Sequence, residues 1–132
     1  MNRPAASSLA PAIGADWQGG IYAGVSVHAN QPVHLILLPG EEKTNWKSAG
    51  EWAAKQGGVL PSRIDQLVLF KHLKGEFQDA WYWSGEPFAG TGDEGFAWSQ
   101  GFGYGGSHYY RMGGIFRARA VCRFATHSFQ EK

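Results

Sequence analysis

The sequence predicts an α+β domain with two helices, a mostly antiparallel sheet and a long glycine- and aromatic-rich loop region in its second half. Apolar residues alternate along residues 21–27 and resume over residues 34–38. The turn residues Asn30 and Pro32 separate these runs, which predicts a β-hairpin. Helical spacing follows the hairpin. Residues 85–114 then contain ten of the 19 glycines, a composition that favours loops and short strands.

The first helix is expected to begin near Trp46. Trp46, Ala49 and Ala53 fall on one helical face, and Trp52 is a further candidate for that face. Gly57 predicts where the helix stops, because glycine readily takes the left-handed conformation that commonly follows a helix C-terminus.

The second helix has a clearer start. Ser62 is a suitable N-cap, and Asp65 three positions later completes a variant of the capping box. The helix is expected to end near Gly75. The i, i+3, i+4, i+7 spacing predicts an apolar face made of Ile64, Leu67, Val68 and the stem of Lys71.

Residues 115–124 predict a strand that closes the domain. Alternation places on its inner face Phe116, Ala118, Ala120, Cys122 and Phe124. Its other face carries Arg117, Arg119 and Arg123. The three arginines form a basic stripe that binds an anion, a solvated sheet face, or a set of pairs with Asp and Glu. All three interpretations stay open.

Composition limits the classes of function. The 132 residues suit one domain, expected over residues 19–132, with residues 1–18 as a flexible arm rich in Ala, Pro and Ser. A net charge of +1 argues against nucleic-acid partners. No apolar stretch approaches the ~20 residues of a membrane span, so we expect neither a membrane partner nor a signal peptide. A single cysteine, Cys122, excludes an internal disulfide and indicates synthesis in a reducing cytoplasm.

Several segments occur together in an order that resembles a known family. They are Gly20-Ile21-Tyr22-Ala23-Gly24, Trp46 with the helix after it, Leu60-Pro61-Ser62-Arg63, Tyr82-Trp83-Ser84, Ala97-Trp98-Ser99-Gln100-Gly101-Phe102 and residues 117–124. The chain resembles the Lcl C-terminal domain family, C-type lectin-like domains of bacterial surface proteins and temperate phages. Its opening segment is similar to that of the short phage members, and the likeness covers residues 19–124.

This resemblance implies a C-type lectin-like fold. In that fold the N- and C-terminal strands pair, here residues 21–27 with residues 115–124, and a long loop region carries the ligand contacts. Family positions that look structural match Trp81, Trp83 and Trp98, which are therefore expected in the core.

Calcium-dependent sugar binding is one chemistry known in this superfamily. Lectins of this kind use a Glu-Pro-Asn or Gln-Pro-Asp triplet and a Trp-Asn-Asp triplet. Residues 86–88 resemble the first, but Phe88 removes a required oxygen, and residues 98–100 lack a carboxylate. Asp93 and Glu94 are near enough in sequence to complete a site with Glu86, so a degenerate calcium site stays open.

Enzymatic chemistry has no comparable signal. The formylglycine-generating enzymes of the same superfamily need several thiols, and the lone Cys122 is expected to be a small core residue. His28 and His34 flank the hairpin turn, either as part of a metal site or as ordinary sheet residues. We therefore expect a non-enzymatic protein without a cofactor or metal.

Residues 85–111 form the predicted binding region, unless they are an exposed hairpin with incidental aromatics. Glycine hinges and Ser, His, Tyr and Arg side chains are typical of adaptable binding surfaces. The expected contact residues are Tyr104, Ser107, His108, Tyr109, Tyr110 and Arg111.

The predicted function is ligand binding by a module of phage or prophage origin, with a host protein or surface glycan as partner. A homo-oligomer is compatible with the exposed aromatics. The alternative is a small accessory protein that binds and modulates a host protein inside the cell. Both a virion location and a host-cytoplasm location stay open.

Overall fold

The computed structural model describes residues 9–90 and 95–126. Within these ranges the chain forms two α-helices and two sheets, so the predicted α+β class is confirmed. The first sheet contains, in spatial order, β1 (Asp16–Trp17), β2 (Gly20–His28), β3 (Gln31–Leu37) and β9 (Val121–Ala125). The second contains β4 (Glu42–Thr44), β8 (Phe116–Ala118), β5 (Trp81–Pro87), β6 (Phe96–Gly101) and β7 (Ser107–Arg111).

The predicted N-terminal hairpin is formed by β2 and β3. Its turn residues Ala29 and Asn30 have φ angles of 51° and 63°. Positive φ at both central residues is characteristic of a type I′ turn, whose twist matches that of the flanking strands. The hairpin also pairs with the segment before it, because Trp17 of β1 lies opposite Gly20. The sheet therefore includes residues from the 1–18 segment that the sequence predicts as an arm.

The closing segment differs from the predicted single strand over residues 115–124. It forms β8 in the second sheet and β9 in the first, and residues 119–120 connect them. β9 pairs with β3, so the predicted pairing with residues 21–27 is wrong. Residues 35–37 of β3 are fully buried, and a strand that is apolar on both faces fits the centre of a sheet. β2 already has β1 on its other side.

The break between β8 and β9 also interrupts the predicted alternation. Arg119, expected on the solvent face, is only 7% exposed, whereas Phe124, expected in the core, is 39% exposed. Cys122 is half-buried against the core. The two terminal nitrogens of buried Arg119 donate to the backbone carbonyls of Glu76 (2.6 Å) and Leu38 (3.1 Å), whereas its Nε has no partner among the described residues.

Both helices begin and end as predicted. In α2 (Trp46–Lys55) the Asn45 side chain caps the N-terminus, and Gly57, just beyond the C-cap, has φ of +89°. In α3 (Arg63–Leu73) Ser62 and Asp65 form both hydrogen bonds of the capping box. A short 3-10 helix, η1 (Lys74–Glu76), follows α3 and ends the helical region at the predicted place.

The predicted apolar face of α3 is wrong at Ile64 and Leu67, although Val68 packs against the second core cluster. Ile64 is 49% exposed and Leu67 is 57% exposed. The buried side of the helix instead presents Asp65, Gln66, Leu69 and Leu73. A periodicity prediction assumes that carboxylates face water, but this helix buries one because partners from the first sheet satisfy it.

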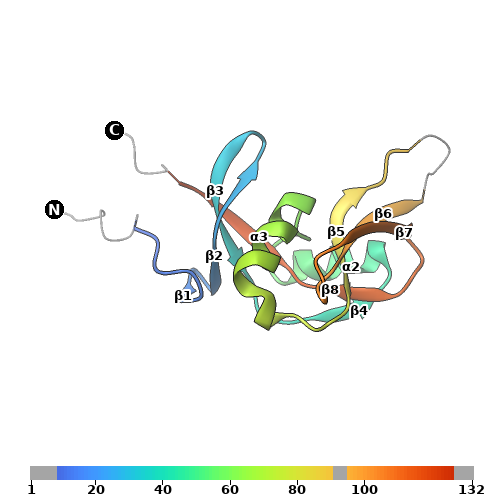
Figure 1. Ribbon diagram of the computed structural model, residues 1–132, viewed down its shortest axis with the longest axis horizontal. Helices are drawn as coiled ribbons and strands as arrows, with labels where there is room; N and C mark the ends of the chain where they lie inside the picture. Colours follow the sequence, from blue (N-terminus) through green and yellow to red (C-terminus); the bar gives the residue numbers. More distant parts are fainter. Residues whose placement is uncertain (1–8, 91–94, 127–132) are drawn as a thin grey trace.

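Two core clusters surround the central strands. One contains the fully buried Trp83 and Ile36, and α2 contributes Ala49 and Ala53 to it. The other forms around Leu69 of α3 and includes Tyr82 and Phe102. Figure 1 shows α3 between the β2–β3 hairpin and the β5–β6 hairpin, which project to the same side of the molecule. The second sheet therefore extends away from the first, with β7 at its edge.

Candidate functional site

The structure divides the predicted contact residues between two faces of the second sheet. Side chains alternate along β7, so the face next to the start of α3 receives Ser107, Tyr109 and Arg111. The opposite face receives Tyr104, His108 and Tyr110. The six residues therefore do not form one patch.

Four aromatic rings lie together on the first of these faces, and we call them the aromatic surface: Phe88, Phe96, Trp98 and Tyr109. The ring of Tyr109 stacks on that of Phe88 with centroids 3.8 Å apart. Tyr109 also makes edge contacts with Trp98 at 5.3 Å and with Phe96 at 5.8 Å. Cross-strand pairing explains the arrangement, because Trp98 on β6 lies directly opposite Tyr109 on β7.

Two guanidinium groups flank the aromatic surface. The Arg63 Cζ atom lies 3.5 Å from the centroid of Trp98, and the Arg111 Cζ atom lies 5.1 Å from that of Phe96. Arg63 is the first residue of α3, and its backbone N–H donates to the Glu86 carboxylate at 2.8 Å. Within the described residues, neither guanidinium has a carboxylate within 4.0 Å. Both cations therefore give the border of the aromatic surface a positive charge.

The opposite face of β7 packs toward the core. The Tyr110 ring lies 5.3 Å from Trp81 and 4.9 Å from Phe116, and Tyr110 packs against the first core cluster. Tyr104 is 70% exposed and has only an edge contact with Trp81 at 5.9 Å. Tyr110 is therefore mainly a packing residue, which the sequence motif could not distinguish from Tyr109.

Sequence reasoning assigned three tryptophans to the core, and they differ in position. Trp83 is fully buried, as predicted. Trp81 and Trp98 are half-buried, and Trp98 lies in the aromatic surface beneath Arg63. Phe88 and Phe96 also belong to this surface, although they were not among the predicted contact residues. The signal that could have identified them is the period-2 spacing that places their side chains on the same face of the sheet as Trp98 and Tyr109.

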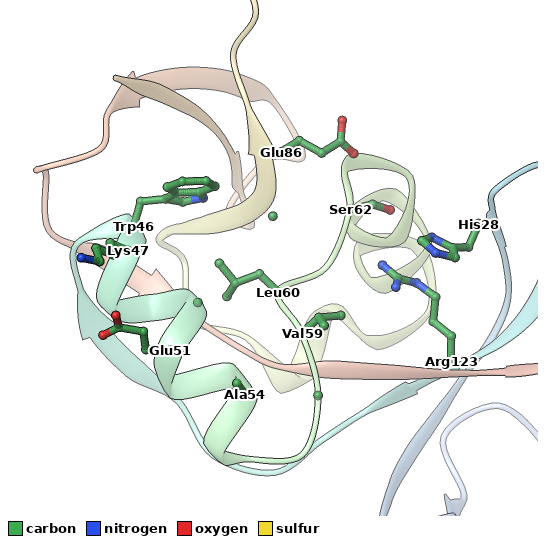
Figure 2. Close-up of a pocket in the computed structure, with 13 residues that line it drawn as sticks. His28, Trp46, Lys47, Glu51, Ala54, Val59, Leu60, Ser62, Glu86 and Arg123 are labelled. Carbon is green, nitrogen blue, oxygen red and sulfur yellow. The ribbon is translucent and has the colours of Figure 1, made fainter. Parts of the chain in front are cut away.

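A groove of about 770 Å³ separates α2 from the start of α3 and the end of β5. Figure 2 shows Trp46 at one end of it, His28 and Arg123 at the other, and Leu60 between them. Charged side chains of both signs border the groove: Lys47, Glu51, Glu86 and Arg123. Its lining comes from widely separated segments, which is why no sequence motif indicated it.

A buried carboxylate organises the Arg123 end of the groove. Asp65 is 0% exposed and accepts hydrogen bonds from Arg123 Nη2 (2.6 Å), the Ser26 hydroxyl (2.6 Å) and the Ser62 backbone N–H (2.9 Å). Three elements, β9, α3 and β2, therefore meet at one side chain. Charge-assisted hydrogen bonds of this kind are the strong ones, and here they compensate for burying a charge.

The other two arginines of the closing segment also have partners. Arg117 pairs with Glu41 at 2.7 Å, and Glu41 accepts a hydrogen bond from the Tyr82 hydroxyl at 2.6 Å. Burial and this hydrogen bond raise the pKa of Tyr82 to about 12. Arg117 binds Glu41 and Arg123 binds Asp65, so the interpretation as pairs with Asp and Glu is confirmed for these two arginines. Arg119 is buried instead. A shared basic stripe is excluded.

Neither candidate metal site is supported. His28 lies opposite Gln31, whereas His34 lies opposite Val25 and contacts the Tyr22 hydroxyl through Nδ1 at 2.8 Å. The two histidines therefore do not face each other. Over residues 9–90 and 95–126, no group of three potential metal ligands comes together. The Glu86 carboxylate caps α3, and the other two residues of the suggested calcium site, Asp93 and Glu94, lie outside the described residues.

The His34 contact predicts a pH dependence. Burial lowers the pKa of His34 from 6.5, because it penalises the imidazolium ion. As the pH falls, the unfolded chain therefore binds a proton at His34 before the folded chain does. The contribution of His34 to the free energy of unfolding is complete above pH 6.5 and is lost as the pH falls through the lowered pKa of the folded state. An NMR titration of the His34 ring should give a midpoint below 6.5, whereas a midpoint at or above that value contradicts the prediction. In Tyr22→Phe, which keeps the ring but removes the hydroxyl, the midpoint should stay low.

Comparison with known proteins adds no assignment. The chain matches no protein-family model and no characterised protein at the level of sequence. The likeness to the Lcl C-terminal domain family thus depends on the residues quoted above. In the part of the chain that the structure describes, neither helix has the length and apolar character needed to cross a membrane.

Proposed function

We propose that the protein is a non-catalytic binding module that recognises a protein or glycan partner through the aromatic surface. One observation carries this proposal: the four rings belong to neither core cluster. They pack on one another and on two guanidinium groups, and they stay partly exposed. Covering such rings with a partner is favourable, because aromatic side chains carry large apolar area.

The chemistry of the surface suits recognition. Trp, Tyr and Arg are the residue types that contribute most at binding interfaces. Tyr109 and Trp98 are already held by their neighbours, so binding costs little side-chain entropy. Arg63 and Arg111 supply hydrogen-bond donors around an apolar centre. The same set would stack on a sugar ring or enclose a peptide side chain.

We extend the proposal to the fold family, a C-type lectin-like domain of the short phage type. The pairing of the N-terminal hairpin with the C-terminal strand supports it, although β3 rather than β2 makes that contact. The position of the aromatic surface supports it as well, because these residues follow the helices in the region where such folds carry ligand contacts.

The accessory-protein alternative places the same binding activity inside the host cell. Its supporting observation is Cys122, a free, half-buried thiol whose pKa is raised by burial, as suits a protein kept in a reducing compartment. Mass spectrometry of purified phage particles separates the two locations. Detection in particles favours the virion module, and detection in lysate alone favours the accessory protein.

Substitution within the aromatic surface tests the proposed function. The purified domain is applied to a glycan array and to a random peptide library displayed on phage. Trp98→Ala and Tyr109→Ala should each reduce binding to the selected ligand at least about tenfold, as expected for hot-spot aromatics. Their melting temperatures should fall by only a few degrees, because neither ring belongs to a core cluster.

Leu67→Ala is the matched control, since Leu67 is an exposed apolar residue on α3. It should leave binding unchanged. Tyr110→Ala is unsuitable because that ring packs near the core. If neither probe binds, or if both surface variants bind like the unmodified protein, the proposed function is wrong.

A further inference from the structure

The strand that carries Tyr109 has an open edge. β7 pairs with β6 on one side, and the structure describes no strand on its other side. The flanking pairs Gly101–Gly106 and Gly95–Met112 are joined by backbone hydrogen bonds of 2.8 Å and 2.7 Å. Hydrogen-bonded and non-hydrogen-bonded residue pairs alternate along an antiparallel ladder. Counting from the two flanking pairs, the backbone groups of His108 and Tyr110 hydrogen-bond to β6.

The alternate residues of β7 direct their backbone groups away from the sheet. These residues are Ser107, Tyr109 and Arg111. One outward carbonyl is already used, because Arg111 O accepts the Gly114 N–H at 2.9 Å. Among residues 9–90 and 95–126, no other group bonds to the N–H groups of these three residues or to the carbonyls of Ser107 and Tyr109. Their side chains also lie on the face of the aromatic surface, so edge and surface form a single recognition element.

Open edges are usually short, charged or covered, because unpaired strands recruit other chains. β7 has five residues and carries aromatic side chains on both faces. Such an edge fits strand addition, in which main-chain hydrogen bonds supply affinity and alternate side chains supply specificity.

We propose that an extended acidic peptide segment of a partner protein adds to the edge of β7 as a further antiparallel strand. This inference rests on the proposed function and names the partner of the same surface. A partner carboxylate lies opposite Arg111, and two positions later an aromatic or β-branched side chain lies opposite Tyr109. Arg63 and Arg111 provide the charge complementarity, since no described carboxylate pairs with either.

A second copy of this chain is a poorer occupant of the edge. An antiparallel β7–β7 pair centred on Tyr109 would place Ser107 opposite each Arg111. It would then bring no carboxylate to either guanidinium from the described part of the chain. The charge pattern therefore favours a foreign strand over self-association.

The test begins with a random decapeptide library displayed on phage and selected on the whole protein. Enriched peptides should carry Asp or Glu two positions before an aromatic or β-branched residue. A synthetic copy of one enriched peptide is then titrated by calorimetry. Methylating its backbone nitrogen opposite Tyr109 should weaken binding at least about tenfold, because one main-chain hydrogen bond is lost and a methyl group clashes. Methylating a neighbouring nitrogen that points away from β7 is the matched control.

Two protein variants complete the test. Ser107→Pro removes an outward N–H at the first residue of an edge strand, where proline is tolerated, and should weaken binding more than Ser107→Ala. Arg111→Glu should reverse the charge preference, so that a peptide with Lys in place of the acidic residue binds better than the original. The proline effect requires pairing along the edge, whereas the charge reversal locates the acidic residue of the peptide beside Arg111.

The outcomes separate this inference from the proposed function. If both N-methylated peptides bind equally well while Tyr109→Ala abolishes binding, strand addition is wrong and the aromatic surface still binds. If no peptide is selected but a glycan binds on the array, strand addition is likewise wrong and the aromatic surface still binds. A dimer seen by analytical ultracentrifugation and lost in Ser107→Pro assigns the edge to a second copy and overturns the peptide proposal.

Discussion

A chain that ends at Gly114 is expected not to fold. The deletion removes β8, which joins β4 to β5 in the second sheet, and β9, which is the outer partner of β3 in the first. Both sheets then lose a strand, and Ala118, Ala120 and Val121 leave the two core clusters. Circular dichroism and thermal melting should show no cooperative transition for the truncated protein, because its loss exceeds the marginal stability of a small domain.

Phe124→Ser provides the control for this truncation. Phe124 is 39% exposed, so the substitution alters the closing strand without removing backbone pairing, and it should melt cooperatively. A cooperative transition in the truncated chain would reject the two-sheet architecture. It would also remove the support for the proposed C-type lectin-like fold.

The second large effect is expected for Asp65→Ala. The substitution leaves Arg123 beside an empty buried site and deprives the Ser26 hydroxyl and the Ser62 N–H of their acceptor. Breaking a buried ion pair by removing one partner costs about 3–5 kcal/mol. The free energy of unfolding, measured by urea titration, should fall by that amount, which is enough to unfold part of the population at room temperature.

Two further variants show whether the buried pair is responsible. Asp79→Ala removes a carboxylate whose side chain is 82% exposed and should change the unfolding free energy by less than about 0.5 kcal/mol. The double variant Asp65→Leu, Arg123→Met should lose less unfolding free energy than the sum of the losses in the two single variants, because neither charge is then left unpaired in the interior. Strict additivity would mean that the two side chains act independently.

Local signals predicted much of this fold correctly. The strand over residues 21–27, the Ser62 capping box and the glycine after α2 each depend on a few neighbouring residues, and the structure confirms all three. The apolar alternation of that strand is wrong in its second half, where Val25 and Val27 are exposed and Ser26 is buried. Such features are encoded by short-range backbone and side-chain chemistry, which a single sequence displays directly.

Long-range contacts explain what could not be predicted. The apolar spacing of Ile64 and Leu67 is regular, yet α3 turns the other way because Ser26 and Arg123 stabilise Asp65 in the interior. Likewise, the break in residues 115–124 depends on competition between two sheets for one segment. Neither effect has a local signature.

The candidate site was predicted in part. Residues 104–111 were selected for composition, and Tyr109 and Arg111 do lie on the aromatic surface. Composition could not separate the two faces of β7, so Tyr110 was grouped with them although it packs near the core. Arg63 was missed as a flanking cation because its position over Trp98 arises only when α3 packs beside the second sheet.

The arginines of the closing segment have a consequence for the order of folding. Arg117 reaches Glu41 across 76 residues, Arg119 reaches the Leu38 carbonyl across 81, and Arg123 reaches Asp65 across 58. Contacts this distant form only after large loops have closed, which slows folding into the millisecond-to-second range typical of non-local topologies. During synthesis, β3 waits without its outer neighbour until residues 121–125 leave the ribosome. The nascent chain thus exposes an apolar strand edge for most of its translation, and chaperone binding at that stage is expected to determine its yield.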